Sequence, residues 1–311
     1  MRVAIIGLGN QGRKRQGLAG ERVVATVDPY NADASCQDIR DLPLGSFDAA
    51  FVCTPDDAKF AITEYLLTNA KHVLVEKPFI AAELPCFHLL RDLAIENRAV
   101  CYTAYNHRFE PHIAKLKDLL DSGELGRIYL AKFFYGNGTA RDVRNSPWRD
   151  RGMGVLSDLG SHLLDLSVFL FGDQRRDFQP WSLSRFENIA FDHALFGSVG
   201  APTLEMEVCL LAWRNAFSIE VFGEKGSAHI DGLCKWGPST FVIRERILPS
   251  GKPDEEKYVL ECADPTWELE QEHFIELCRL GYVGLEKDQW IYGVLSGMLD
   301  GVDTGQKEND N

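Results

Sequence analysis

The fold class of this chain is decided by its first strand and turn, Val3-Ala4-Ile5-Ile6-Gly7-Leu8-Gly9-Asn10-Gln11-Gly12. An apolar, β-branched run that leads through a glycine-rich turn into a helix is how an open α/β sheet presents the pyrophosphate of a dinucleotide. In this GxGxxG pattern, Gly7 would allow the tight turn, Gly9 the close approach of backbone to phosphate, and Gly12 the packing of helix on strand. Asn10 and Gln11 belong to the same expected cofactor-binding turn.

A second apolar run, Val23–Val27, ends at Asp28, which stands 21 residues after Gly7. An acidic side chain there accepts hydrogen bonds from the adenosine ribose hydroxyls, and it repels a 2′-phosphate, so it favours NAD over NADP. The opposing hint is Arg13-Lys14-Arg15, because cations at the start of the first helix could serve a phosphate; solvation of a helix face is the plainer interpretation. An ordinary strand–turn–helix with Asp28 as a loop cap is the structural alternative.

The composition is that of a globular protein with room for two domains. The 311 residues are 45% apolar and 25% charged, and 33 basic against 46 acidic residues give a net charge of −13, which argues against nucleic acid as a partner. The eight cysteines include no CxxC pair and predict reduced core residues rather than disulfides or a zinc site. No apolar stretch approaches the length of a membrane span and the chain begins directly in a strand, so we expect a cytoplasmic protein.

Strands and helices alternate along the first hundred residues. After the two strands already named, strands and helices are predicted in turn at 47–53, 59–68, 72–75, 84–97 and 99–103. Such alternation predicts right-handed βαβ crossovers and a parallel sheet. The segment 29–45 carries little helical pattern, so we expect that crossover to be irregular. We assign residues 1–107 to a Rossmann dinucleotide-binding domain.

The rhythm changes after residue 110. Long β-rich runs joined by short turns, such as Gly223–Gly226, predict an antiparallel sheet, with helices before and after it. We expect residues 108–300 to form an α+β domain for substrate binding and oligomerisation, with a large, mainly antiparallel, open-faced sheet. Such a sheet would leave an apolar face uncovered in a monomer, so a homodimer or homotetramer through it is expected. Residues 301–311 form a polar C-terminal tail.

Two segments carry side chains suited to catalysis. Glu76-Lys77-Pro78 follows a predicted parallel strand at the edge where open α/β sheets bind ligands, although from position alone a surface lysine is the better interpretation. The proline restricts Lys77 to extended geometry, and the bond between them is a candidate cis peptide. Asp158 and His162 stand four apart on a predicted helix, so they suit proton transfer, with a plain surface pair as the alternative.

Taken together, the motifs match a known family over almost the whole chain. The chain resembles the Gfo/Idh/MocA oxidoreductases, the group that includes inositol dehydrogenase and glucose–fructose oxidoreductase. The resemblance rests on Gly7–Gly12, Thr54-Pro55, Glu76-Lys77-Pro78, Asn106-His107-Arg108-Phe109, Asp158-x-x-x-His162 and Phe222-Gly223-Glu224-Lys225-Gly226-Ser227. Each motif is modest alone, but their order and spacing are specific.

The resemblance implies a catalytic trio of Lys77, Asp158 and His162 that needs no metal. His162 would take the proton from a substrate hydroxyl as hydride passes to nicotinamide, while Lys77 would stabilise the developing alkoxide. Asp158 would position the hydroxyl and the histidine.

The family also implies where the cofactor lies. The nicotinamide is expected between Thr54-Pro55, Glu76-Lys77 and Asn106. Two positions that are often histidine in the family hold Lys59 and Arg15 here, which leaves the finer cofactor contacts open.

The segment 141–151, just before the catalytic helix, holds four arginines. The resemblance places substrate in this region, where Arg144 and Arg149 could bind a phosphate or carboxylate and Trp148 could stack on a sugar face. A nucleotide-linked or acidic sugar is therefore one expectation. A solvated loop whose arginines pair with neighbouring aspartates is the other, and a neutral sugar or cyclitol stays open.

Three functions compete at this point. The leading hypothesis is an NAD-dependent dehydrogenase that oxidises a secondary hydroxyl of a sugar or cyclitol. The second is a redox-neutral glycoside hydrolase of the same family, in which bound NAD oxidises the glycoside only transiently. The third is a non-catalytic regulator that binds the dinucleotide as a ligand. The presence of Lys77, Asp158 and His162 counts against the third, because a sensor needs no such trio.

Overall fold

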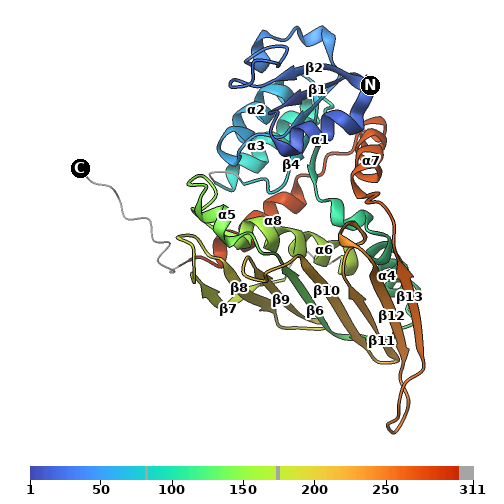
Figure 1. The fold of residues 1–311 in the computed structure, drawn as a ribbon. Coiled ribbons are helices and arrows are strands. Elements are labelled where there is room, and N and C mark those ends of the chain that lie inside the picture. The colour runs from blue at the N-terminus through green and yellow to red at the C-terminus, as the bar shows by residue number, and fades with distance from the viewer. Residues whose placement is uncertain (81–82, 173–175, 301–311) are drawn as a thin grey trace. The chain divides into compact units, whose positions relative to one another are not determined.

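The computed structural model describes residues 1–80, 83–172 and 176–300, and its contacts divide the chain into two compact units (Figure 1). The first unit comprises Met1–Asn106 and Thr266–Gly293; the second comprises His107–Pro265 and the residues from Val294 onward. This division differs from the sequence-based one, which placed all of 108–300 in the second domain. The predicted tail at 301–311 lies outside the described residues.

The first unit is a five-stranded parallel sheet with the strand order β2-β1-β3-β4-β5. Its strands are β1 (Val3–Ile6), β2 (Val23–Val27), β3 (Ala49–Val52), β4 (His72–Glu76) and β5 (Cys101–Ala104). Its helices are α1 (Asn10–Ala19), α2 (Asp56–Thr68), α3 (Pro85–Glu96), α7 (Thr266–Leu280) and the greater part of α8 (Glu286–Gly297). The predicted parallel Rossmann sheet is confirmed.

Both faces of this sheet are covered, which explains why its strands are mostly apolar. On one face Ile6 packs with Leu66 of α2 and Leu90 of α3. On the other face Ile5 packs with Ala19 of α1 and Phe274 of α7. Because α7 supplies part of this second core, residues 266–293 group with the first unit although they come last in the chain.

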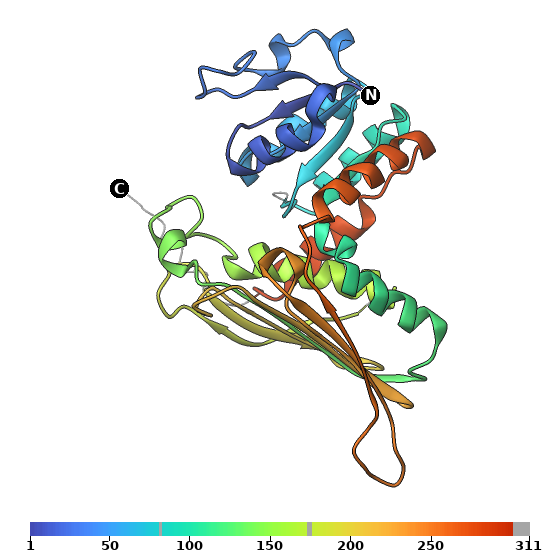
Figure 2. The same cartoon turned by 45° about the vertical axis from the view of Figure 1, so that its right-hand side comes forward.

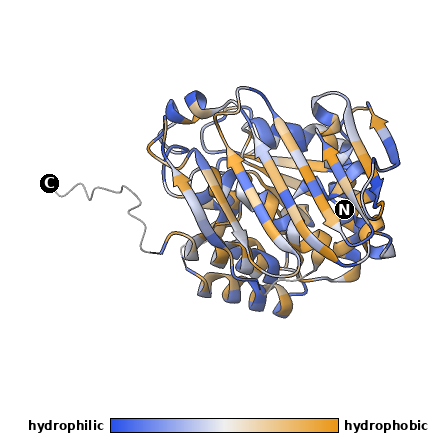
Figure 3. Ribbon diagram, turned by 90° about the horizontal axis from the view of Figure 1, so that it is seen from below, coloured by the Kyte–Doolittle hydropathy of each residue, from blue (hydrophilic) through white to orange (hydrophobic). Residues whose placement is uncertain are grey.

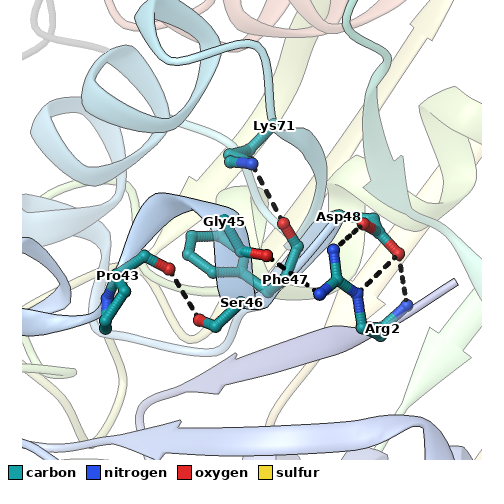
Figure 4. A network of polar contacts seen from close by, with 7 residues as sticks. All are labelled: Arg2, Pro43, Gly45, Ser46, Phe47, Asp48 and Lys71. Carbon is teal, nitrogen blue, oxygen red and sulfur yellow. Dashed lines mark hydrogen bonds and ion pairs between the residues drawn. The ribbon is translucent and has the colours of Figure 1, made fainter.

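The entry into β3 is fixed to the start of β1 by a polar network (Figure 4). The Arg2 guanidinium donates to the Asp48 carboxylate at 2.6 Å and to the Gly45 carbonyl at 2.9 Å. The Arg2 backbone N–H also donates to Asp48, at 2.7 Å, and Lys71 donates to the Phe47 carbonyl at 3.0 Å. These bonds hold β1 and β3 side by side at the point where they enter the sheet.

The crossover from β2 to β3 is irregular, as expected. Cys36 makes an isolated parallel bridge with Val27, and two short 3₁₀ turns follow, η2 (Ile39–Asp41) and η3 (Leu44–Ser46). No α-helix is found in this segment, all of which is described. In the strand order β2-β1-β3, the chain builds the sheet on one side of β1 and then on the other. The glycine turn follows β1 and lies at this change of direction, where open α/β sheets bind ligands.

The second unit is an eight-stranded sheet in the order β13-β12-β11-β10-β6-β9-β8-β7. Its strands are β6 (Ile128–Gly136), β7 (Gln179–Ser184), β8 (His193–Ser198), β9 (Thr203–Cys209), β10 (Ala216–Gly223), β11 (Gly226–Asp231), β12 (Ser239–Glu245) and β13 (Glu255–Leu260). All neighbours are antiparallel except β6 and β9. The predicted mainly antiparallel sheet is confirmed, although β7 and β8 were not anticipated because glycine, serine, proline and histidine dilute their β-strand pattern.

One face of this sheet is packed and the other is open (Figure 2). The packed face is apolar, with Phe133, Met206 and Ile219 at most 2% exposed, and helix α4 (Pro111–Ser122) and the turn η5 (Leu156–Gly160) pack against it. Helix α6 (Ser161–Phe171) continues from η5 and packs on α4.

The open face is mixed rather than apolar (Figure 3). Lys132 and Glu205 pair across β6 and β9 at 3.8 Å, and His193 and Glu207 pair across β8 and β9 at 3.1 Å. The expectation of an uncovered apolar face is therefore wrong, because several residues that point outward from the central strands are polar or charged. Among the described helices, none is both long and apolar enough to cross a membrane.

Candidate active site

The glycine turn has the geometry that a bound pyrophosphate requires. Gly7 has a φ of +88°, and a Cβ added there would lie 2.7 Å from the Cys53 carbonyl oxygen. A Cβ on Gly12 would lie 1.8 Å from the Gly7 carbonyl oxygen, so neither position accepts a side chain. A Cβ on Gly9 would meet nothing within 4 Å, and Gly9 caps the exposed N-terminus of α1. The turn is thus a cradle that stays open only without a side chain at Gly9, and it fits a dinucleotide phosphate.

Asp28 ties this turn to the end of β2. Its Oδ2 accepts from the Leu8 backbone N–H at 2.7 Å, and its Oδ1 accepts from the N–H groups of Tyr30 and Asn31 at 2.9 and 3.0 Å. Partial burial acts to raise the pKa of Asp28, but these donors and the Arg13 charge outweigh it and hold that pKa below its usual value. A carboxylate offers about four acceptor sites, so three backbone donors leave one site for a ribose hydroxyl.

The ends of β3 and β5 carry the other predicted cofactor contacts of the first unit. The Thr54 hydroxyl is buried, and no hydrogen-bond partner for it is found among the described residues. Pro55 follows as the N-cap of α2. Asn106 is 7% exposed and donates through Nδ2 to the Thr266 hydroxyl at 2.7 Å. The buried, unsatisfied hydroxyl of Thr54 suits a polar cofactor group at this edge of the sheet.

Lys59 supports the turn that carries Lys77. The Lys77–Pro78 bond is cis, as the sequence suggested. Lys59 is 2% exposed, and its ammonium donates to the Pro78 carbonyl and to Asp56, both at 2.7 Å. Burial lowers the pKa of Lys59, and Asp56 opposes that shift. Lys59, at a position that is often histidine in the family, therefore fixes the Glu76-Lys77-Pro78 turn through its hydrogen bond to the Pro78 carbonyl.

Arg15 is likewise a buried structural cation rather than a phosphate ligand. Its guanidinium is 1% exposed, donates to Glu76 at 2.7 Å and to Glu270 of α7 at 2.5 Å, and lies 4.3 Å from the Trp267 ring centroid. Lys14 lies over the same ring at 3.8 Å. Arg15 is therefore not available to a 2′-phosphate, because it is buried against Glu270 of α7, a helix expected in the other domain. A role of Arg13 or Lys14 toward such a phosphate stays a prediction.

Glu270 gives the stability of this unit a pH dependence. Complete burial raises the pKa of Glu270 to about 7, against an ordinary value of 4.5, although Arg15 opposes the shift. The folded state therefore retains a proton that the unfolded chain loses, and stability falls as pH rises from 4.5 toward 7.

We expect Glu270→Gln to make the free energy of unfolding, measured by thermal unfolding, less dependent on pH across this window. The pH-dependent change that is lost is on the order of a few kcal/mol at most. Glu268→Gln, at an exposed position of the same helix, is the control and should keep the wild-type slope; a parallel slope for Glu270→Gln would contradict the assignment.

Asp158 and His162 lie where a π-helical turn, η5, passes into α6. The leucines that recur here at helical spacing are all buried: Leu156, Leu159, Leu163, Leu166 and Leu170. His162 is 5% exposed, stacks on the His107 ring with centroids 4.1 Å apart and planes 17° apart, and meets the Tyr135 ring edge-on at 5.8 Å. Burial and, secondarily, the Asp158 charge raise the pKa of Tyr135, so Tyr135 stays neutral. His162 is thus a constrained, mostly buried imidazole, not a surface one.

The residues after Asn106 organise this half of the site, and sequence reasoning gave them no role. His107 provides the stacking partner of His162, and Arg108 holds Asp165 of α6 through two bonds of 2.7 Å. Glu110 is 1% exposed and accepts from the backbone N–H and the thiol of Cys234, at 3.0 and 3.1 Å. The next residue, Lys235, lies 3.2 Å from His107 Nε2. The motif match at 106–109 was the available signal for these contacts.

The predicted substrate residues separate into two places. Arg149 lies 3.8 Å from the Asp158 carboxylate, and Trp148 beside it is 56% exposed. Arg144, at the end of α5 (Ala140–Arg144), instead lines a cavity of about 530 Å³ with Asp150, Phe186, Glu187, Asn188 and Ile189. That cavity includes neither Asp158 nor His162. The structure therefore brings Arg149, but not Arg144, to the candidate catalytic pair.

Comparison with known proteins bears on both units. Residues 1–105 match the oxidoreductase family with an NAD-binding Rossmann fold, and residues 113–229 match the GFO/IDH/MocA C-terminal domain. The chain belongs to the Gfo/Idh/MocA family. The two matches fall on the glycine cradle and on the unit that holds Asp158 and His162, so the family resemblance seen in the motifs is confirmed.

Individual relatives are more distant. Inositol 2-dehydrogenase of Rhizobium meliloti is 25% identical over 215 residues, which cover 63% of this chain and 61% of that protein. Glucose-6-phosphate 3-dehydrogenase of Bacillus subtilis is 33% identical over 110 residues, 34% of this chain and 31% of that one. The chain therefore spans less than two thirds of the length of these relatives in the aligned regions. Levoglucosan dehydrogenase, solved with NADH and levoglucosan, shares the fold with a TM-score of 0.81 at 16% identity, covering 96% of both chains.

Proposed function

We propose that this protein is an NAD-dependent dehydrogenase that transfers a hydride between a secondary hydroxyl of a sugar or cyclitol and nicotinamide. The observation that carries the proposal is the open cradle at Gly9, flanked by the sterically fixed Gly7 and Gly12 and tied to Asp28. Such a turn binds a dinucleotide phosphate, and the family to which the chain belongs consists of oxidoreductases.

The chain's own residues are proposed to divide the work as follows. The backbone N–H groups at the start of α1, with Asn10 and Gln11, hold the pyrophosphate, and the remaining acceptor site of Asp28 holds a ribose hydroxyl. Thr54, Pro55, Glu76 and Asn106 bound the space for the nicotinamide. Nicotinamide, when bound, supplies the hydride acceptor or donor.

A residue of the second unit is proposed to accept the proton of the substrate hydroxyl. His162 takes it from the substrate hydroxyl, since a neutral imidazole is the side chain best matched to proton transfer near neutral pH. Asp158 orients the hydroxyl, and Arg149, whose guanidinium lies 3.8 Å from the Asp158 carboxylate, is proposed to contact the substrate as well. Lys77 donates a hydrogen bond to the same oxygen and stabilises the negative charge that develops on it.

The substrate class is proposed to be a sugar or cyclitol. Relatives named inositol 2-dehydrogenase and glucose-6-phosphate 3-dehydrogenase support polyhydroxylated rings. Arg149 and the exposed Trp148 suit an anionic or stacked ring, whereas Arg144 lines the separate cavity and is a weaker candidate. Assembly through the second sheet also remains a proposal, and its mixed open face favours a polar interface over an apolar one.

A substrate panel tests the proposal. The purified protein is incubated with NAD or NADP and with pyranoses, sugar phosphates, sugar nucleotides and cyclitols, and the absorbance of reduced nicotinamide is followed. Steady reduction with one member of the panel is the expected result. Release of aglycone from an aryl glycoside without net reduction would instead favour the redox-neutral hydrolase. Binding of NAD with neither reaction would favour the regulator.

Cofactor preference depends on Asp28. We expect Asp28→Asn to reduce the preference for NAD over NADP by about tenfold or more, because it removes the charge that repels a 2′-phosphate. The ratio of the two dissociation constants, measured by calorimetry, checks this. Asp33→Asn, an exposed position on the same loop, should leave the ratio unchanged. An unchanged ratio in Asp28→Asn would show that Asp28 only braces the turn.

A further inference from the structure

The loop between β11 and β12 brings a cation, Lys235, to His107, the ring that stacks on the candidate catalytic His162. This loop contains a 3₁₀ turn, Cys234–Trp236, and its position is fixed by Glu110, which accepts both the N–H and the thiol of Cys234. The Lys235 ammonium lies 3.2 Å from Nε2 of His107, and the Trp236 ring lies 5.9 Å from Tyr135. The Cys234–Trp236 loop thus contacts both the His107 ring and the Tyr135 ring, which are far from it in the sequence.

The contact between Lys235 and His107 specifies the proton of that ring. An ammonium group has donors and no acceptor, so Nε2 of His107 accepts from Lys235, and the single proton of a neutral ring then resides on Nδ1, a buried atom. His107 is 2% exposed, so protonating it would place a buried cation beside the half-buried Lys235 ammonium. The geometry thus favours a neutral His107 in one tautomer.

The stacking of His107 on His162 means that the charge state of one ring affects protonation of the other. The two rings are nearly parallel at 4.1 Å, a geometry in which two imidazolium ions would repel each other strongly. The edge-on Tyr135 ring limits the remaining freedom of His162. With His107 held neutral, the proton taken up by the stacked pair goes to His162.

We propose that Lys235 is a positioning residue for His162, acting through the neutral His107 ring, so that His162 is the one ring of the pair that takes up a proton. This inference rests on the proposed function for the role of His162, but the state of His107 stands independently of it. The charged or titratable groups near the pair include Asp158, which pairs with Arg149; Asp165, which pairs with Arg108; Glu110, which holds the loop; and the neutral Tyr135.

Histidine NMR tests the proposal without any substrate. In protein labelled with ¹⁵N-histidine, assigned with His107→Asn and His162→Asn, the His107 signals should show a proton on Nδ1 and stay neutral through the range, near pH 6.5, in which free histidine titrates. In Lys235→Met the His107 signals should titrate within or near that range, and Lys235→Arg should restore the wild-type pattern. Lys225→Met, in the β10–β11 turn, is the charge-matched control and should behave as wild type.

Kinetics supply the second readout. With the substrate found in the panel, the acidic limb of the kcat/KM profile in Lys235→Met should move by about one pH unit toward higher pH, because removing a nearby cation makes His162 easier to protonate. A His107 that titrates normally in the wild-type protein would overturn the proposal, as would a profile unchanged in Lys235→Met. A wild-type protein that reduces no nicotinamide but shows a neutral His107 would refute the proposed function and leave the assignment of His107 intact.

Discussion

Replacing His162 with Asn is expected to lower kcat for hydride transfer by about 10²–10⁴-fold, the range typical for loss of a general base. Asparagine can still fill the space beside His107 and Tyr135, but it cannot accept the substrate proton near neutral pH. NAD affinity should stay within about twofold of wild type, because the glycine cradle and Asp28 belong to the other unit. Steady-state kinetics and NAD titration of the same preparation give both values.

The matched control for this variant is His193→Asn. His193 lies on the open face of the sheet and pairs with Glu207 across β8 and β9, so it should be dispensable for activity. A His162→Asn enzyme that keeps the kcat of the wild type, as His193→Asn should, would contradict the assignment of His162 as the base. An equal loss in both variants would point to damage of the unit as a whole.

Replacing Gly9 with Asp is expected to weaken NAD binding by at least about 100-fold, which corresponds to about 2.7 kcal/mol. The structure has open space at the Gly9 Cβ, so the protein should fold normally. The new carboxylate would project toward the space in which the pyrophosphate must lie, and it would repel that group as well as obstruct it. Calorimetric titration with NAD and a thermal-unfolding curve without ligand separate binding from stability.

Gly17 offers a control in the same helix. It is exposed, and a Cβ there also meets nothing within 4 Å, but it lies on α1 two turns beyond the cradle. Gly17→Asp should bind NAD like the wild type. Gly12→Ala should behave differently from both, because its Cβ would collide with the Gly7 carbonyl and lower stability. Normal NAD binding by Gly9→Asp would exclude the cradle as the phosphate site.

The parts of the fold that could be predicted from sequence are those set by local physics. The Gly7–Gly12 turn follows from neighbouring residues, since strand, turn and helix are contiguous and each glycine has a local steric reason. Helix α4 begins at a proline and ends before a glycine, and both are local signals. The buried leucines from Leu156 to Leu170 recur at helical spacing.

What could not be predicted depends on contacts between distant segments. Arg15 looks like a solvated helix residue until Glu270, 255 positions away, is placed beside it. Lys235 and His107 are 128 positions apart and belong to no common motif. The polar character of the open face of the second sheet depends on which residues of each strand point outward, and a shift of one residue in register turns every side chain to the opposite face. Long-range pairing of this kind decides the domain membership of α7 and the surroundings of His162.

Titration of the purified protein with NAD, with Gly9→Asp as the comparison, tests the central claim most directly. We expect saturable binding of NAD to the wild-type protein, weaker binding of NADP, and loss of NAD binding in Gly9→Asp without loss of folding. A folded wild-type protein that binds neither dinucleotide would contradict the cradle, and with it the proposed hydride transfer.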